Sequence, residues 1–125
     1  MVGNKSCICQ PTEMLIFPCS GGSNVGQIAN EAAKQLTNQG VGKMYCLAGI
    51  GGHISGIVES TKAAKKIVAI DGCPVACARK TLEHAGFKID EHTIVTELGI
   101  TKVSGFTLKD TDIQKVVEKL QKVNK

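Results

Sequence analysis

Short apolar runs alternate along the chain with longer segments in which apolar residues recur at the spacing of a helix. The apolar runs predict four strands, and the clearest of them is rich in β-branched residues and ends at an Asp-Gly pair. The predicted strands are Met14–Pro18, Lys43–Leu47, Lys66–Gly72 and a segment within Lys88–Glu97.

Four amphipathic segments predict helices between and after these strands. They are Asn24–Asn38, Ser55–Ala64, Pro74–Ala85 and a C-terminal helix that begins near Thr111. Ser23 is a suitable N-cap for the first helix, and Gly40 is expected to end it in the left-handed conformation. Cys73 is expected to cap the third helix, with Pro74 as its first residue. Thr111 and Gln114 resemble a capping box at the start of the last helix.

The alternation of strands and helices predicts an α/β fold. Because parallel strands are joined by right-handed crossovers, we expect a small three-layer, Rossmann-like domain with a mostly parallel sheet of about four strands flanked by helices. Aromatic residues make up only 3% of the chain, so the core must be aliphatic, which suits central strands buried on both faces. Residues 1–12 are expected to be a flexible leader, and residues 13–125 a single domain.

Charge and composition argue against two classes of partner. The formal net charge is only +4, and the chain has one Tyr and no Trp for base stacking, so nucleic-acid binding is not expected. No apolar run approaches the roughly eighteen residues of a membrane span, and the N-terminus lacks a signal core, so we expect a cytoplasmic protein. A reducing cytoplasm disfavours disulfides, which leaves metal or redox chemistry as roles for the six cysteines.

Four cysteines fall at the carboxyl ends of predicted strands. Cys19 follows the first strand, Cys46 lies near the end of the second, and Cys73 follows the third, with Cys77 in the next helix. In an open parallel sheet, the loops at these strand ends form the crevice where ligands bind. We therefore expect the four cysteines to meet at one edge of the sheet.

The expected local structure favours thiolates at this edge. On a helix that begins at Pro74, Cys73 and Cys77 would project from the same face, as i and i+4 neighbours do. The partial positive charge of a helix N-terminus lowers the pKa of a nearby thiol, and Cys19 precedes a helix through a Gly-rich turn whose amides can donate to its sulfur. Cys46 by itself is also explained by packing, because cysteine is among the most buried residue types.

Several other residues carry weaker signals. Cys7 and Cys9 lie in the leader, where they can join the cysteine cluster, form a second redox pair or have no role, and we expect no role. The Gly-rich segment that opens the first helix has Gln27 where a phosphate-binding loop has lysine, so nucleotide hydrolysis is not expected. Asp71 either accepts hydrogen bonds at the cysteine edge or only forms the turn.

The three histidines are expected to be ordinary surface residues. His53 lies at the same edge as the cysteines, where it can complete a metal site or act as a general base, but an exposed loop histidine is the simpler interpretation. His84 is expected near a helix end, where its protonated form suits the helix dipole. His92 is expected on a surface strand or turn.

The cysteine pattern resembles the DGC-domain family, which is named after a central Asp-Gly-Cys and to which zinc binding is attributed. Here the motif is Asp71-Gly72-Cys73, with Cys77 after it, a Pro18-Cys19-Ser20-Gly21 turn after the first strand, and Cys46 in the second. The resemblance covers the chain from the first strand to the C-terminal helix. It implies four chelating cysteines and zinc, and it implies no reaction.

Three hypotheses use the same cysteines. In the first, the protein is a metal carrier, a sensor or a module that docks an unidentified protein, and zinc is held tetrahedrally by Cys19, Cys46, Cys73 and Cys77. Helix N-termini and Arg79 or Lys80 would offset the charge of the four thiolates. In the second, a low-pKa cysteine, best Cys73 or Cys19, carries a persulfide or forms a reversible disulfide. In the third, the cysteines hold an iron–sulfur cluster. Whether the protein is an enzyme stays open.

Overall fold

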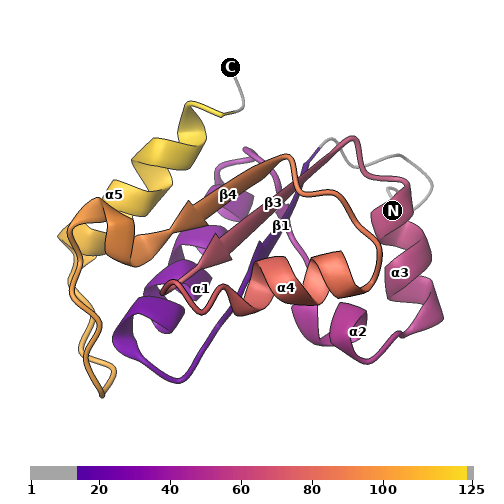
Figure 1. Cartoon of the computed structure of the whole chain (residues 1–125). Coiled ribbons are helices and arrows are strands. Elements are labelled where there is room, and N and C mark those ends of the chain that lie inside the picture. Colours follow the sequence, from indigo (N-terminus) through magenta and orange to yellow (C-terminus); the bar gives the residue numbers. More distant parts are fainter. Residues whose placement is uncertain (1–13, 124–125) are drawn as a thin grey trace.

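The fold is described for residues 14–123 in a computed structural model (Figure 1). Four strands form one parallel sheet in the order β2-β1-β3-β4. They are β1 (Met14–Pro18), β2 (Lys43–Met44), β3 (Lys66–Asp71) and β4 (Glu91–Ile94). β3 pairs with all of β1, from Met14 opposite Lys66 to Pro18 opposite Ile70. The predicted leader, residues 1–12, lies outside the described residues.

Helices cover both faces of the sheet and give three layers (Figure 1). The α1 (Asn24–Asn38) and α5 (Asp110–Gln121) helices pack on one face, and α2 (Leu47–Gly51), α3 (Ser55–Lys62) and α4 (Cys77–His84) pack on the other. A short 3-10 helix, η1 (Val95–Leu98), follows β4. The prediction of a Rossmann-like α/β fold is confirmed. None of the described helices is long and apolar enough to cross a membrane.

Alternate residues of the central strands enter opposite layers of the core. In β3, Val68 and Ile70 pack toward α1 and α5, whereas Ile67 and Ala69 pack toward α2, α3 and α4. All four side chains are buried, because a central parallel strand is covered by helices on both faces. This double burial explains why the strand appears in the sequence as a continuous apolar run.

The second strand is shorter than predicted. β2 ends at Met44, and Cys46 is instead the N-cap residue of α2. The Gly-rich stretch that follows is helical, and it packs closely against α3. A Cβ atom at Gly49 would lie only 2.7 Å from Cγ1 of Ile57, so the missing side chain lets the two helices approach each other.

The start of α4 also differs from the prediction. The helix begins at Cys77 rather than at Pro74, and its N-cap residue, Ala76, has the left-handed conformation with φ 57°. Cys73 is therefore a turn residue and not a helix cap. The amides of Ala78 and Arg79 in the first turn of α4 donate to the Asp71 carboxylate, which fixes where the helix starts.

Three predictions concern the ends of the two longest helices, and two of them are confirmed. Ser23 caps α1 by accepting a hydrogen bond from an amide of the first turn, and Gly40 lies just past its end with φ 78°. The capping box at α5 is wrong, because its N-cap residue is Lys109 and makes no side-chain capping bond. Asp110 and Asp112 in the first turn of α5 instead interact favourably with the helix dipole.

Two glycines let the end of β3 and the turn after β1 meet the start of α1. A Cβ atom at Gly72 would lie 2.7 Å from the backbone nitrogen of Gly26, and a Cβ atom at Gly26 would lie 2.5 Å from the carbonyl oxygen of Gly21. Both distances are too short for a side-chain carbon. The turn after β1, the first turn of α1 and the end of β3 are therefore in direct backbone contact.

We expect Gly72→Ala to lower the free energy of unfolding by about 1–3 kcal/mol, because the backbone segments on both sides must move apart. Urea unfolding followed by circular dichroism measures this loss. Gly22→Ala is the matched control in the same region, because a Cβ atom there meets nothing within 4 Å. The control should change the free energy by less than about 0.5 kcal/mol, and equal losses in the two variants would contradict the close backbone approach.

The two buried threonines provide a second stability test. The hydroxyl of Thr93 has no hydrogen-bond partner within the described part of the chain, whereas the hydroxyl of Thr61 donates to the carbonyl oxygen of Ile57 at 2.8 Å. We expect Thr93→Val to leave the free energy of unfolding unchanged or to raise it by up to about 1 kcal/mol. Thr61→Val should lower it by about 0.5–1.5 kcal/mol. The reverse order of the two variants in urea unfolding would show that Thr93 has a partner.

Candidate functional site

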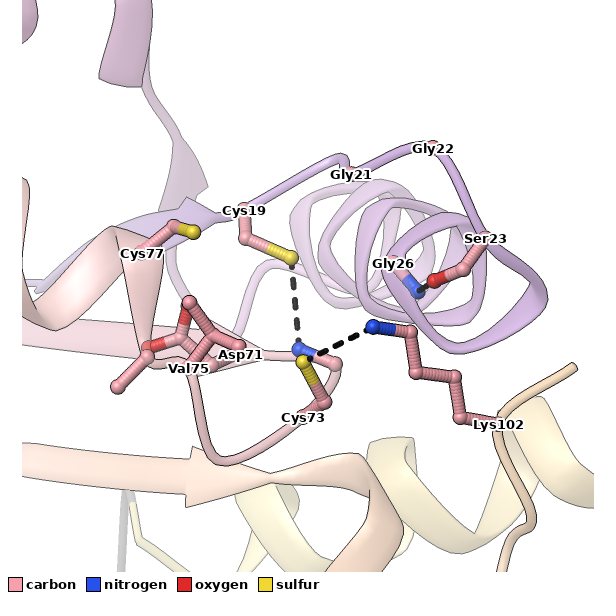
Figure 2. A pocket seen from close by; sticks show the side chains of 12 residues that line it. Cys19, Gly21, Gly22, Ser23, Gly26, Asp71, Cys73, Val75, Cys77 and Lys102 are labelled. Atoms are coloured by element: carbon pink, nitrogen blue, oxygen red, sulfur yellow. Dashed lines mark hydrogen bonds between the residues drawn. The ribbon is translucent and has the colours of Figure 1, made fainter. Parts of the chain in front are cut away.

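Three of the four predicted cysteines line one pocket at the carboxyl ends of β1 and β3. The pocket has a volume of about 290 Å³ and includes Cys19, Cys73 and Cys77. Figure 2 shows the side chains of Cys19 and Cys73 pointing into the same space. The side chain of Lys102 reaches toward Cys73 from the right of this view. The remaining wall comes from Gly21, Gly22, Ser23, Gly26, Asp71, Gly72, Val75 and Ala76. The sheet thus brings together cysteines from two separate strand ends, as expected.

Cys19 is a half-buried thiol of this pocket. It continues β1, where its amide donates to the carbonyl oxygen of Ile70 at 2.9 Å, and its sulfur accepts a hydrogen bond from the Gly72 amide at 3.4 Å. Burial raises the pKa of the Cys19 thiol, and the nearby Asp71 carboxylate and Cys77 add to this rise. Hydrogen bonds from the amides of Gly21 and Gly72 oppose it but do not overcome it. The expectation of a lowered pKa at Cys19 is therefore wrong.

Cys73 and Cys77 belong to different local structures. Cys73 is half-buried in the turn after β3, and Cys77 is the exposed first residue of α4. The two residues are therefore not i and i+4 neighbours on one helix, which the sequence had suggested. Cys77, rather than Cys73, is the cysteine that lies in the first turn of α4.

Lys102 is a site residue that the sequence analysis missed. Its ammonium group donates to the sulfur of Cys73 at 3.5 Å and lies in the wall of the pocket. Arg79 and Lys80, which were expected to offset the charge of the thiolates, do not line this pocket. The guanidinium group of Arg79 instead forms an ion pair with Glu83 at 3.3 Å. The positive charge beside Cys73 thus comes from a loop that is distant in the sequence but close in space.

Asn24 explains how this loop reaches the site. The side chain of Asn24 is buried at the start of α1, where its Nδ2 donates to the carbonyl oxygen of Thr101 at 2.8 Å. Its Oδ1 accepts from the amide of Val103 at 2.7 Å. These bonds hold the residues on both sides of Lys102, so the lysine is directed to the pocket. No sequence signal linked Asn24 to a segment so far along the chain.

Asp71 connects the pocket to its supporting elements. Its carboxylate is buried and accepts hydrogen bonds from the amides of Ala78 at 2.7 Å and Arg79 at 3.1 Å. It also lies 2.8 Å from Nε2 of His92 in β4. The open question about Asp71 is thereby answered, because it accepts backbone bonds that cap α4. His92 is not the surface residue that was expected, since only 21% of its side chain is exposed.

Cys46 lies apart from the other three cysteines. It is exposed at the N-terminus of α2 and lines a neighbouring pocket of about 460 Å³, in which Cys19 also takes part. His53 is exposed and lines neither pocket. Cys7 and Cys9 lie outside the described residues. Cys19 is thus the residue that connects Cys46 with the other two cysteines.

The donor set fits zinc in its chemistry. Thiolates are preferred ligands of zinc, and an ammonium group beside them reduces the negative charge that they would accumulate. Within residues 14–123, however, no three His, Cys, Asp or Glu side chains are grouped closely enough to hold an ion as they stand. Zinc binding would therefore require rotation of the exposed side chains of Cys46 and Cys77.

Comparison with known proteins identifies the family of this chain. Residues 15–120 match the DGC domain family. The chain is 31% identical over 109 residues to the anaerobic and virulence modulator AnvM of Pseudomonas aeruginosa, an alignment that covers 87% of this chain and 83% of the relative. No solved structure matches the chain. Because the family match extends over most of the described fold and includes all four cysteines, the chain belongs to the DGC-domain family.

Proposed function

We propose that this protein binds one zinc ion through Cys19, Cys46, Cys73 and Cys77 and acts as a regulatory protein rather than as an enzyme. The observation that carries the proposal is the pocket that Cys19, Cys73 and Cys77 share, together with the adjoining pocket of Cys46, which Cys19 also lines. A cytoplasmic location is part of the proposal, because thiols stay reduced there.

The proposed ion has a regulatory rather than a structural role. An apolar core fills both faces of the sheet, so we expect the chain to fold without a metal. Four sulfur ligands would also leave no open coordination position for an activated water, which argues against hydrolytic catalysis. The relative AnvM is named as a modulator, and we extend a modulating role to this chain. A carrier, a sensor and a module that docks a partner protein all fit such a role.

A second candidate function is a thiol redox response, and it is favoured by Lys102. An ammonium group that donates to the Cys73 sulfur stabilises a thiolate there, and a thiolate is the reactive form of cysteine. Two cysteine thiols would lose two protons and two electrons to a peroxide, which is reduced, and would form a disulfide. The word "anaerobic" in the name of AnvM suits a response to oxidants.

We expect protein purified without chelators to contain about one equivalent of zinc and to be colourless. Elemental analysis and a count of reactive thiols before and after zinc removal measure this. Four additional thiols should react after the metal is removed. An iron–sulfur cluster would give a brown protein with iron and sulfide, and metal-free protein with unprotected thiols would contradict the zinc proposal.

Serine variants at single positions identify the ligands. Cys19→Ser, Cys46→Ser, Cys73→Ser and Cys77→Ser should each weaken zinc binding by about tenfold or more, because each removes one sulfur ligand. Cys7→Ser is the matched control from outside the proposed site and should leave the zinc content unchanged. Unchanged binding in Cys46→Ser alone would show that only the three cysteines of the shared pocket hold the ion.

Lys102→Met tests the redox candidate in protein from which metal has been removed. Without the ammonium group the Cys73 thiolate loses a favourable charge interaction, so its reaction with iodoacetamide should slow by about two- to fivefold. Mass spectrometry of the peptide that contains Cys73 measures the rate. Lys80→Met is the matched control, because Lys80 does not line the pocket. Equal rates in the two variants would remove the support for the redox candidate.

A further inference from the structure

Two histidines form a pair outside the pockets that the cysteines line. His53 follows α2, and His84 is the last residue of α4. Both side chains are exposed, and their ring centroids lie 6.0 Å apart. We propose that His53 and His84 form a second metal site, which binds a divalent cation of the late first transition row such as Zn²⁺ or Ni²⁺.

The distance between the rings suits a shared ion. A zinc–nitrogen bond is about 2.0–2.1 Å long and the ring centroid lies about 1.1 Å behind the nitrogen, so two imidazoles on one ion have centroids roughly 5–6 Å apart. The ring planes are tilted by 54°, so the rings do not stack face to face. Small rotations of two exposed side chains are enough to direct one nitrogen of each ring to the same point.

The backbone at His53 is one that glycine adopts more easily. His53 has a left-handed conformation with φ 56°. Its amide donates to the carbonyl oxygen of Ile50 at 3.1 Å, and the Ile54 amide donates to that of Gly49 at 2.9 Å, which are the two bonds of a Schellman motif. Glycine usually occupies this position, and two glycines directly precede it in the chain. A histidine is nevertheless present, in a strained conformation, beside His84.

The surrounding elements favour a cation at this place. Both histidines lie at C-terminal ends of helices, where the backbone carbonyl groups carry a partial negative charge. A Cβ atom at Gly51 would lie 3.6 Å from Cγ2 of Thr81, so α2 and α4 are packed together next to the pair and hold its spacing. Lys80 lies one turn before His84 on α4, and its positive charge disfavours a bound cation. The positive charge of Arg79 is already paired with Glu83.

Two protein ligands leave the remaining coordination positions to water. Such a site binds weakly and exchanges its ion readily, in contrast to four sulfur ligands that enclose an ion. The metal class follows from the donors, because imidazole prefers zinc, nickel and copper over magnesium and calcium. The inference does not rest on the cysteine site.

The test follows the three histidine side chains of the full-length protein by NMR during titration with zinc chloride, beyond a first equivalent of zinc. The ring signals of His53 and His84 should shift together with one common affinity. His92 is the internal control, because its Nε2 is bonded to Asp71, and its signal should stay in place. Equal shifts at all three histidines would show nonspecific binding and would overturn the proposal.

Single variants separate a shared ion from two independent ones. His84→Gln should weaken zinc binding at His53 by about tenfold or more, and His53→Asn should do the same at His84. Asparagine tolerates the left-handed conformation, so this variant keeps the turn, and circular dichroism checks the fold of both. If each remaining histidine binds zinc with unchanged affinity, the shared site is wrong. Because the readout is at the imidazole rings, failure of the cysteines to bind zinc would leave this result unchanged.

Discussion

The close approach of two backbone segments, near Gly26 and Gly72, is the constraint on which the cysteine site depends. The end of β3 can touch the first turn of α1 because Gly72 has no Cβ atom, and the turn after β1 can touch the same helix turn because Gly26 has none. This contact brings the Gly72 amide to the sulfur of Cys19 and places Cys73 next to it. A larger residue at Gly72 would push the end of β3 away from α1, and one at Gly26 would push the turn after β1 away, so each change would displace a segment that carries a cysteine of the site.

Two buried polar side chains position the other residues of the site. Asp71 caps α4 and so determines where Cys77 enters the pocket wall. Asn24 binds the backbone on both sides of Lys102 and so delivers a positive charge to Cys73. Each polar group is buried at a helix start, where unpaired hydrogen-bonding groups are costly, so its bonds stabilise the fold and position the site at once.

The chemistry of the pocket reflects a balance between burial and charge. Burial of Cys19 raises the pKa of its thiol, so a metal ion or another positive charge is needed to stabilise its thiolate. Lys102 supplies such a charge on the Cys73 side of the pocket. The two proposed roles, zinc binding and thiol oxidation, would use the same sulfur atoms and would therefore exclude each other.

The α/β class, the four strands and the edge of the sheet at which the cysteines lie could all be predicted from the amino-acid sequence. These properties depend on apolar periodicity and on the rule that parallel strands end at one edge, both of which are local or topological. Three features emerge only in the folded protein: α4 starts at Cys77, β2 stops before Cys46, and Lys102 faces Cys73. The physical reason is that each of these outcomes is set by contacts between segments distant in the chain, such as those of Asp71 and Asn24, and a linear pattern carries no signal for them.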